Sequence, residues 1–389
     1  MIQRLALLGA TGSIGASTVE VVRHHPDRLS IATLGALGRN PEELLALARE
    51  FRPLLLAVVD PAVARDLRPA LPPGVELASG PEALLAAATH PGVDKVVAAI
   101  VGAAGLPPVA AALGAGKSVA LANKESLVVA GSLLTDLARR TGAEIVPIDS
   151  EHVALHQALR CGTREEVRRL VLTASGGPFL DRDPTTFATI RPEEALRHPT
   201  WSMGAKISVD SSTLINKGLE LIEASHLFGI APEAIDVVIH PRSLVHSLVE
   251  FRDGSWLAQL SVNDMIFPIQ YALAYPERWA NDFPRLDLAE LGTLEFLPLD
   301  NRRFPAVELA RAALAAGESA PAVLNAANEV AVHAFLDGEI GYPDILAVLE
   351  EVLAAHHAEA LADLDAALEW DRWGRQLANQ ALSKRRRSR

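Results

Sequence analysis

Residues 2–15 read IQRLALLGATGSIG, an apolar run that leads directly into a glycine loop. The run Ile2–Leu8 is typical of a buried strand, and Gly9, Gly12 and Gly15 form a G-x-x-G-x-x-G pattern before a helical segment. In such a loop the first glycine allows a tight turn, the second lets backbone N–H groups approach a pyrophosphate, and the third lets the helix pack on the strand. A plain turn is the alternative, but the position between strand and helix favours dinucleotide binding at the helix N-terminus.

The alternation of strand and helix continues to residue 149. Several apolar runs are almost entirely Val, Ile, Leu and Ala, which is typical of parallel strands covered on both faces. Repeated strand–helix–strand units predict a doubly wound α/β domain, Rossmann-like, over residues 1–149. The expected strands are Ile2–Leu8, Ser30–Leu34, Leu54–Asp60, Lys95–Val101, Ser118–Ala122 and Glu144–Asp149, and the expected helices are Ser13–His25, Pro41–Phe51, Pro81–Ala88, Leu106–Ala115 and Lys124–Arg140.

The pattern changes after residue 149. A mixed α+β domain is predicted over residues 150–276, with a hairpin around the Asp253-Gly254 turn. A connector over 277–303 leads to an alanine- and leucine-rich helical bundle of about four helices over 304–389. The cationic run Lys384–Arg389 is expected to be a solvated tail. Expected elements are the helices His152–Leu159 and Ser212–Phe228, the strands Val167–Ala174, Ile235–His240, Leu244–Arg252 and Ser255–Val262, the loop Ser175–Gly204, and helix breaks at Ala316-Gly317, Asp337-Gly338 and His356–Leu361.

Composition narrows the class of protein. The formal net charge of -12 disfavours nucleic acid and anionic lipid as partners, so an anionic ligand needs a local pocket of cations and amides. The single cysteine, Cys161, excludes an intramolecular disulfide framework and is interpreted as structural. No signal peptide is recognised at the N-terminus, and Val96–Val101 is far shorter than a membrane helix. A cytoplasmic enzyme with a small-molecule substrate is expected.

The end of the second strand indicates which dinucleotide binds. NAD sites place an acid about 20 residues beyond the glycine loop to hold the ribose 2′-hydroxyl. Here the strand ends in Gly38-Arg39-Asn40, which offers a cation and an amide and no acid. The planar guanidinium of Arg39 suits a 2′-phosphate, so NADP is predicted; capping of a surface loop by Arg39 is the alternative.

Carboxylates in two distant segments suggest a metal site. Asp149 and Glu151 follow the last predicted strand of the first domain and, in extended backbone, project to the same face. An N-cap with acids that favour the helix dipole is the alternative reading of this pair. Glu220 lies four residues after Asn216 on a predicted helix, beside Lys217, and offers a third carboxylate. Oxygen-only ligation favours Mg²⁺ or Mn²⁺.

Other polar residues suit a phosphate. Ser175 precedes two glycines with free amides after a strand, and Ser211, Asn216 and Lys217 offer further donors. The long loop at 175–204 predicts either a lid or a disordered segment. Trp201 favours a lid that covers a ligand, with His198 donating to its phosphate.

These motifs resemble those of the 1-deoxy-D-xylulose 5-phosphate reductoisomerase family, over residues 1 to about 380. The resemblance rests on several long runs in the family's order. They are Gly9–Gly15, ANKESL at 122–127, IDSEH at 148–152, LTASGGPF at 172–179, HPTWSMG at 198–204, KISVDSSTLINKGLE at 206–220 and NAANEV at 325–330.

The resemblance implies an NADPH-dependent conversion of 1-deoxy-D-xylulose 5-phosphate to 2-C-methyl-D-erythritol 4-phosphate in the non-mevalonate isoprenoid pathway, with Mg²⁺ or Mn²⁺, and Co²⁺ as a further candidate. It also implies a homodimer, and a flap near residues 195–205. The implied metal ligands are Asp149, Glu151 and Glu220; the catalytic residues are these and Lys124; the substrate residues are Lys124, Ser150, Glu151, Ser175, His198, Trp201, Met203, Ser211, Asn216, Lys217, Glu220 and His246; the cofactor residues are Thr11, Gly12, Ser13, Ile14, Gly38, Arg39, Asn40, Asn123, Glu125 and Gly204.

The sequence departs from the family pattern at a few positions. Val153 stands where Asn is common, Ala174 where Gly is common, and Ser261-Val262-Asn263 replaces a Gly-Glu-Pro-like run. None of these is an implied metal ligand. Two other functions compete: an NADP dehydrogenase of the homoserine or semialdehyde type, which has no need of three carboxylates, and a non-catalytic NADP sensor, which has no need of a phosphate clamp.

Overall fold

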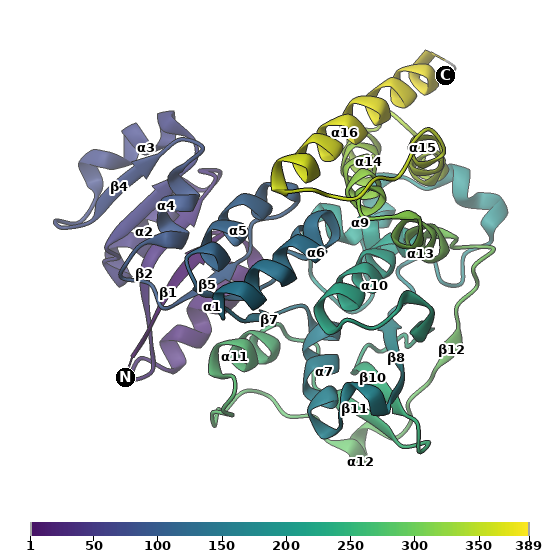
Figure 1. The fold of residues 1–389 in the computed structure, drawn as a ribbon, viewed down its shortest axis with the longest axis horizontal. Helices are drawn as coiled ribbons and strands as arrows, with labels where there is room; N and C mark the ends of the chain where they lie inside the picture. The colour runs from purple at the N-terminus through teal and green to yellow at the C-terminus, as the bar shows by residue number, and fades with distance from the viewer. Residues whose placement is uncertain (1, 388–389) are drawn as a thin grey trace. The chain divides into compact units, whose positions relative to one another are not determined.

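The protein is described by a computed structural model covering residues 2–387 (Figure 1). Its internal contacts divide the chain into two compact units. Unit 1 contains the chain up to Ser126, together with Leu134–Val153 and Asp264–Phe283. Unit 2 contains Leu127–Leu133, Ala154–Asn263 and the chain from Pro284 onward.

Unit 1 is built on a parallel sheet of seven strands in the order β4-β3-β2-β1-β5-β6-β7. The sheet pairs β1 with both β2 and β5, so the strand order reverses beside β1, where doubly wound folds bind nucleotides. The predicted α/β class is therefore confirmed. The strands are β1 (Gln3–Leu8), β2 (Leu29–Ala36), β3 (Leu55–Val58), β4 (Glu76–Ser79), β5 (Lys95–Ala98), β6 (Ser118–Leu121) and β7 (Ile145–Pro147).

Helices connect these strands and cover the sheet. α4 packs against α5, and α1 packs against α11, which returns to unit 1 from much later in the sequence. Val21 and Val22 of α1 share a core with Ile266 and Ile269 of α11. The helices are α1 (Ser13–His24), α2 (Pro41–Phe51), α3 (Pro61–Leu67), α4 (Ala83–Thr89), α5 (Leu106–Gly114), α6 (Lys124–Thr141) and α11 (Ile266–Ala274).

Two elements of unit 1, β4 and α3, were not predicted from the sequence. The edge strand β4 was not predicted, because its four residues are exposed or half-buried and show no apolar run. The short helix α3 was not predicted either, although Asp60 caps it by accepting from Ala62 N at 2.8 Å and Pro61 opens it. That pair of residues was a usable signal.

Unit 2 holds a mixed sheet of five strands in the order β11-β10-β8-β9-β12. β8 (Val167–Ala174) pairs parallel with β9 (Ile235–Ile239) and antiparallel with β10 (Val245–Phe251). β10 and β11 (Trp256–Leu260) form the predicted hairpin. β12 (Leu297–Pro298) closes the other edge against β9.

Helices α9 (Ala205–Thr213) and α10 (Ile215–Phe228) replace the single helix predicted from Ser212 to Phe228. The chain breaks at Leu214, which adopts a left-handed conformation with φ 61°. No glycine marks this break, so the helical pattern of the sequence does not show it. α7 (Ser150–Ala158) and α8 (Pro192–Ala195) complete the helices before the hairpin, and α12 (Leu288–Leu291) follows it.

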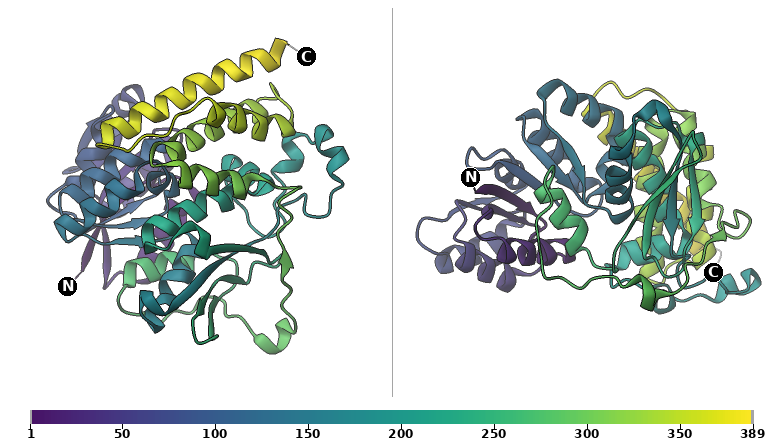
Figure 2. Two further views of the ribbon diagram at one scale, coloured as in Figure 1. Left: turned by 45° about the vertical axis from the view of Figure 1, so that its right-hand side comes forward. Right: turned by 90° about the horizontal axis from the view of Figure 1, so that it is seen from below.

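The four predicted C-terminal helices are confirmed. They are α13 (Ala306–Ala316), α14 (Ser319–Leu336), α15 (Tyr342–Ala354) and α16 (Leu364–Arg387). α14 packs against α15 and α16, and the long α16 runs alongside these helices in Figure 2. They belong to the same unit as the five-stranded sheet.

The described part of the predicted solvated tail at Lys384–Arg389 is largely exposed, as expected, but it is helical. α16 continues to residue 387, and Lys384 and Arg385 each bond to Glu351 of α15, at 2.8 and 2.7 Å. Arg386 also pairs with Glu339. These ion pairs join the end of α16 to Glu351 and Glu339; residues 388–389 lie outside the described part of the chain. Within the described residues, no helix combines the length and apolarity needed to cross a bilayer.

Candidate active site

The glycine loop of unit 1 has the predicted geometry. Gly9 has φ +90°, and a Cβ on it would lie 2.4 Å from the carbonyl oxygen of Ala99. A Cβ on Gly15 would lie 2.4 Å from the carbonyl oxygen of Ala10, so only glycine lets the helix start this close to the loop. Gly12 is exposed, with Thr11 and Ser13 beside it. The loop therefore offers an open backbone surface at the N-terminus of α1.

The residues after β2 divide their roles. Gly38 has φ +103°, a conformation that favours glycine. Asn40 caps α2: its Oδ1 accepts from Glu43 N at 3.4 Å, and its Nδ2 donates to Glu43 Oε2 at 2.7 Å. Because Asn40 does the capping, Arg39 is not needed for it, and its side chain is exposed.

Asn123 is buried and organises the loop after β5. Its Nδ2 donates to the carbonyl oxygens of Ile100 at 2.6 Å and Gly102 at 2.9 Å, and lies 3.1 Å from Glu125 Oε2. Its Oδ1 accepts from Ser126 N at 3.0 Å and so caps α6. The polar atoms of Asn123 thus hold together the carboxyl end of β5 and the start of the helix that carries Lys124.

Asp149 and Glu151 come together at the start of α7. An oxygen of each carboxylate lies within 4.8 Å of the other. The sequence analysis assumed an extended backbone at these residues, and that assumption is wrong. β7 ends at Pro147, and Val153 N donates to the carbonyl oxygen of Asp149, so Asp149 opens the helix. The two side chains converge across the first helical turn instead. The alternative interpretation, in which Asp149 and Glu151 open a helix, therefore describes the backbone correctly. It does not prevent the two carboxylates from lying close together.

Lys124 and His152 surround the Asp149 carboxylate. Lys124 Nζ lies 2.6 Å from Asp149 Oδ2, and His152 Nδ1 lies 3.8 Å from Oδ1. Burial by itself would raise the pKa of Asp149, but the charge of Lys124, with smaller contributions from His152 and Glu151, holds it well below its usual value. Asp149 is therefore ionised near neutral pH. The sequence argument missed His152, although its position three residues after Asp149 on a helix was a signal.

Three side chains of α10 form a cluster, which we call the clamp: Asn216, Lys217 and Glu220. Asn216 Nδ2 donates to Glu220 Oε1 and Lys217 Nζ donates to Oε2, both at 2.5 Å. Glu220 is 1% exposed and Lys217 is 4% exposed. The predicted four-residue spacing is confirmed, and the buried carboxylate is fixed from both sides.

Ser175 and His198 are joined in unit 2. His198 Nε2 lies 2.9 Å from Ser175 Oγ, while His198 Nδ1 lies 3.3 and 3.0 Å from the backbone nitrogens of Thr200 and Trp201. Because Nδ1 accepts from these N–H groups, it carries no proton and Nε2–H donates to Ser175. A Cβ on Gly177 would lie 2.8 Å from the carbonyl oxygen of Ser211, so this loop packs tightly on α9.

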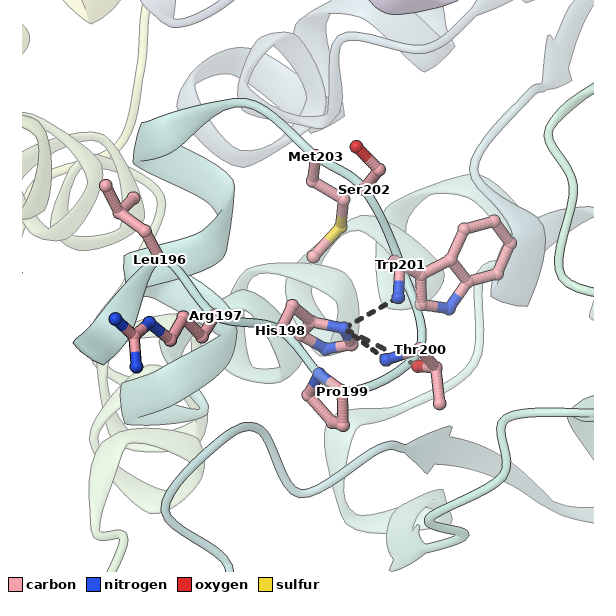
Figure 3. A pocket seen from close by; sticks show the side chains of 8 residues that line it. All are labelled: Leu196, Arg197, His198, Pro199, Thr200, Trp201, Ser202 and Met203. Atoms are coloured by element: carbon pink, nitrogen blue, oxygen red, sulfur yellow. Dashed lines mark hydrogen bonds between the residues drawn. The ribbon is translucent and has the colours of Figure 1, made fainter. Parts of the chain in front are cut away.

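We call the segment Leu196–Met203 the flap. Its eight consecutive residues line a pocket (Figure 3). Figure 3 shows the ring of Trp201 directed away from that of His198. The Trp201 ring lies 6.3 Å from the ring of His246 on β10, and Met203 is half-buried. Gly204 ends the flap and occupies the N-cap position of α9.

Each unit thus assembles part of the predicted site by itself. Unit 1 brings together Lys124, Asp149 and Glu151, and it carries the glycine loop and Arg39. Unit 2 joins Ser175 to His198, Asn216 and Lys217 to Glu220, and Trp201 to His246. A parallel sheet that reverses order beside a glycine loop, with an exposed arginine in place of the usual acid, defines the class of NADP-dependent oxidoreductases.

Comparisons with known proteins identify the family. Three family models cover most of the chain: 1-deoxy-D-xylulose 5-phosphate reductoisomerase over residues 5–131, its C-terminal domain over 145–228, and the DXP reductoisomerase C-terminal domain over 260–377. The chain is 50% identical to the 1-deoxy-D-xylulose 5-phosphate reductoisomerase of Anaeromyxobacter dehalogenans, with 98% of each chain covered. It is also 50% identical to that of Chlorobaculum tepidum, over 97% of this chain and 99% of the relative.

Solved structures agree. A reductoisomerase in complex with NADPH, fosmidomycin and magnesium superposes with a TM-score of 0.91 at 44% identity, covering 98% of each chain. The Zymomonas mobilis enzyme with NADPH gives a TM-score of 0.92 at 42% identity, covering 98% of this chain and 99% of that one. The chain belongs to the 1-deoxy-D-xylulose 5-phosphate reductoisomerase family.

Proposed function

We propose that the protein converts 1-deoxy-D-xylulose 5-phosphate to 2-C-methyl-D-erythritol 4-phosphate with NADPH and a divalent cation, a step of the non-mevalonate isoprenoid pathway. The observation that carries this proposal is the buried Glu220 carboxylate. Asn216 and Lys217 fix it on the unit that also holds the Ser175–His198 pair. A simple NADP dehydrogenase has no use for such a carboxylate beside a phosphate site.

The residues present fit a hard divalent cation. Asp149, Glu151 and Glu220 supply only carboxylate oxygens, the donors that Mg²⁺ and Mn²⁺ prefer. Asp149 is ionised, and its carboxylate lies close to that of Glu151. We propose that these three residues hold Mg²⁺ or Mn²⁺, with Co²⁺ as a further candidate. When bound, the ion supplies a Lewis acid for the substrate's oxygens.

The phosphate and chain of the substrate are assigned to unit 2. Ser175, His198, Ser211, Asn216 and Lys217 would bind them, and the neutral His198 donates through Nε2. Ser150 and Lys124 would hold the substrate's other oxygens with Asn216, while Trp201 and Met203 cover it and His246 borders it. Binding energy from the remote phosphate orients the reacting carbons, and the closed flap excludes water.

NADPH is assigned to the glycine loop and the carboxyl ends of β2 and β6. The loop from Thr11 to Ile14, exposed at Gly12 and Ser13, would hold the pyrophosphate, and the exposed Arg39 would hold the 2′-phosphate. The proposed reaction first rearranges the carbon skeleton of the substrate to an aldehyde. When bound, NADPH supplies the hydride that reduces this aldehyde. The remaining proposed contacts are Gly38, Asn40, Asn123, Glu125 and Gly204.

Lys124 stands apart among the proposed catalytic residues because it already touches a proposed ligand. Its ammonium lies 2.6 Å from Asp149 Oδ2 with 7% of its side chain exposed. In that position it balances the charge that develops on substrate oxygens while one carbon–carbon bond breaks and another forms.

We further propose a homodimer that works in the cytoplasm, in which residues 1–149 bind NADPH and contribute Lys124 and Asp149, while residues 150–276 carry the other proposed metal ligands and most of the substrate-binding residues. The family resemblance supports the dimer. The single cysteine, Cys161, is free and fits a reducing compartment.

The direct test is NADPH oxidation after addition of 1-deoxy-D-xylulose 5-phosphate. We expect turnover in Mn²⁺ or Mg²⁺, none after chelation with EDTA, and recovery when the metal returns. Turnover of homoserine or a semialdehyde that persists in EDTA would replace this proposal with the simple dehydrogenase. NADPH binding without any turnover would favour the sensor.

Arg39→Glu tests the choice of cofactor. A carboxylate in place of the guanidinium repels the 2′-phosphate, so we expect the Kd of NADPH to rise by about 100-fold and that of NADH to change little. Arg65→Glu, an exposed charge reversal on α3, is the matched control. Equal weakening of both cofactors by Arg39→Glu would move the 2′-phosphate elsewhere.

A further inference from the structure

His246 lies at a β-bulge in the hairpin of unit 2. Val245 of β10 pairs with Leu260 of β11, but Ser247 pairs with Gln259, so β10 carries one extra residue at this point. That residue is His246. Bulges leave the extra residue out of the ladder, and they often redirect a side chain beside an active site.

The bulge is held from the neighbouring strand. Thr173 Oγ1 on β8 lies 2.8 Å from the carbonyl oxygens of both Val245 and His246. Thr173 is 3% exposed, so its hydroxyl proton is shared between these two acceptors away from water. This contact fixes the two carbonyls that the irregular register would leave poorly paired. Thr173 also lies two residues before Ser175, so the bulge is tied to the strand that presents the proposed phosphate loop.

The imidazole of His246 has a partner directly after the next strand, β11. His246 Nε2 lies 2.8 Å from Ser261 Oγ, and the His246 side chain is buried. The ring also lies near Trp201 of the flap, at 6.3 Å between ring centroids and an interplanar angle of 51°. The imidazole therefore lies between a serine that orients it and the aromatic ring of the flap.

We propose that Ser261 is a positioning residue for the flap: through Nε2 of His246 it orients the imidazole against which Trp201 packs when the flap closes. Ser261 follows β11 directly, and its hydroxyl is the group that Nε2 of His246 meets at 2.8 Å.

The inference rests on the proposed function, because it concerns closure over that substrate. Ser261→Ala removes the hydroxyl and Ser261→Thr keeps it. We expect Ser261→Ala to raise the KM for 1-deoxy-D-xylulose 5-phosphate about fivefold, the effect of one lost hydrogen bond, with kcat changed less than twofold. Ser261→Thr should stay close to the wild type. The matched control is Ser255→Ala, which removes a serine hydroxyl from the turn of the same hairpin.

A second variant separates action through His246 from action by any other route. His246→Phe keeps an aromatic ring and removes Nε2, so Ser261→Ala should have no further effect on KM in that background. The same fivefold increase in the His246→Phe background would overturn the proposal, and so would an unchanged KM in Ser261→Ala alone.

Flap packing is also measurable without turnover. Acrylamide quenching of Trp201, isolated by subtracting a Trp201→Phe variant, should be stronger in Ser261→Ala than in the wild type or in Ser255→Ala. If the wild type fails to oxidise NADPH, the proposed function is wrong, while this quenching comparison still decides whether Ser261 orients the contact. Equal quenching in all three proteins would overturn the inference whatever the activity.

Discussion

The clamp and the flap lie in the same unit, but their proposed ligand-binding side chains are held in different ways. In the clamp, a buried carboxylate is bonded on both oxygens by residues of its own helix. In the flap, His198 bonds to the flap's own backbone and reaches out to Ser175, and Trp201 meets His246 through a ring contact. The side chains of the clamp are fixed by their own helix, whereas the flap is a loop that packs on other segments of the unit.

The difference shows how one site separates two requirements. Charged groups that act on a transition state gain most when they are fixed before the substrate arrives. A covering segment must release product, so it is bound by contacts that are individually weak. Substitutions in the clamp should therefore change chemistry, and substitutions in the flap should change binding and closure without changing stability.

The largest expected effect comes from Glu220→Gln. The amide is neutral and a poor metal ligand, so turnover should fall by about a thousandfold or more, beyond the 10–100-fold typical of partners outside the ligand sphere. The Kd of NADPH, followed by cofactor fluorescence, should stay within about twofold. Glu233→Gln, an exposed acid of the same unit, should behave like the wild type. Undiminished turnover in Glu220→Gln would remove this residue from the metal site.

Trp201→Ala should give the next effect. Loss of a large apolar cover costs about 1.5–3 kcal/mol of ligand burial, so we expect the KM to rise roughly ten- to a hundredfold. Because the ring is half-buried on a loop, the free energy of unfolding should change by less than about 0.5 kcal/mol. Urea denaturation and steady-state kinetics on one preparation test both points. A large loss of stability would mean that the flap is part of the fixed structure.

Asn328→Ala should reverse that pattern. Asn328 on α14 donates to Asp210 Oδ1 at 2.9 Å, and both residues are at most 1% exposed. Removing a hydrogen bond to a buried carboxylate should lower the free energy of unfolding by about 2 kcal/mol. The control is Asn379→Ala, where an exposed asparagine bonds to the carbonyl of Arg375. A loss below about 0.5 kcal/mol would show that α9 does not depend on this bond.

A pH-dependent effect concerns α7, the helix that Asp149 opens. Burial, with a smaller contribution from the charge of Arg160, lowers the pKa of His156 from 6.5 to about 4. Between these values the unfolded chain binds a proton that the folded chain does not, so stability falls as the pH falls from 6.5 to 4. His156→Gln should reduce this slope by at most about 1.4 kcal/mol per pH unit, measured by urea unfolding at pH 7, 5.5 and 4.5. The exposed His357→Gln should leave it unchanged.

Local sequence patterns predicted the regular part of the fold. The glycine loop, the buried strands and the Asp253-Gly254 hairpin depend on neighbours in the sequence, and the structure has them close to the expected residues. β4 was missed because an exposed edge strand carries no apolar pattern. The bond that holds the terminal cations in α16 comes from Glu351, more than 30 residues away, and no local pattern shows it.

In the candidate site, too, contacts within one helix could be predicted, and contacts between distant segments could not. The i, i+4 spacing of Asn216 and Glu220 fixes their contact as soon as the helix forms. The pairs Ser175–His198 and Trp201–His246 depend on how a loop folds back, so spacing alone could not give them. Leu214 ends one helix and starts another without the glycine that usually marks a left-handed residue.

The late return of α11 to unit 1 has a consequence for the order of events during synthesis. Ile266, Ile269 and Tyr271 complete the core that α1 and the first strands begin, yet more than 100 residues of unit 2 are made before them. Domains generally fold as units while the ribosome works from the N-terminus. Here the nascent N-terminal sheet must wait, with an apolar surface uncovered, until about residue 283 has left the exit tunnel. A chain that stalls earlier would therefore be a natural client for chaperones that bind apolar surfaces.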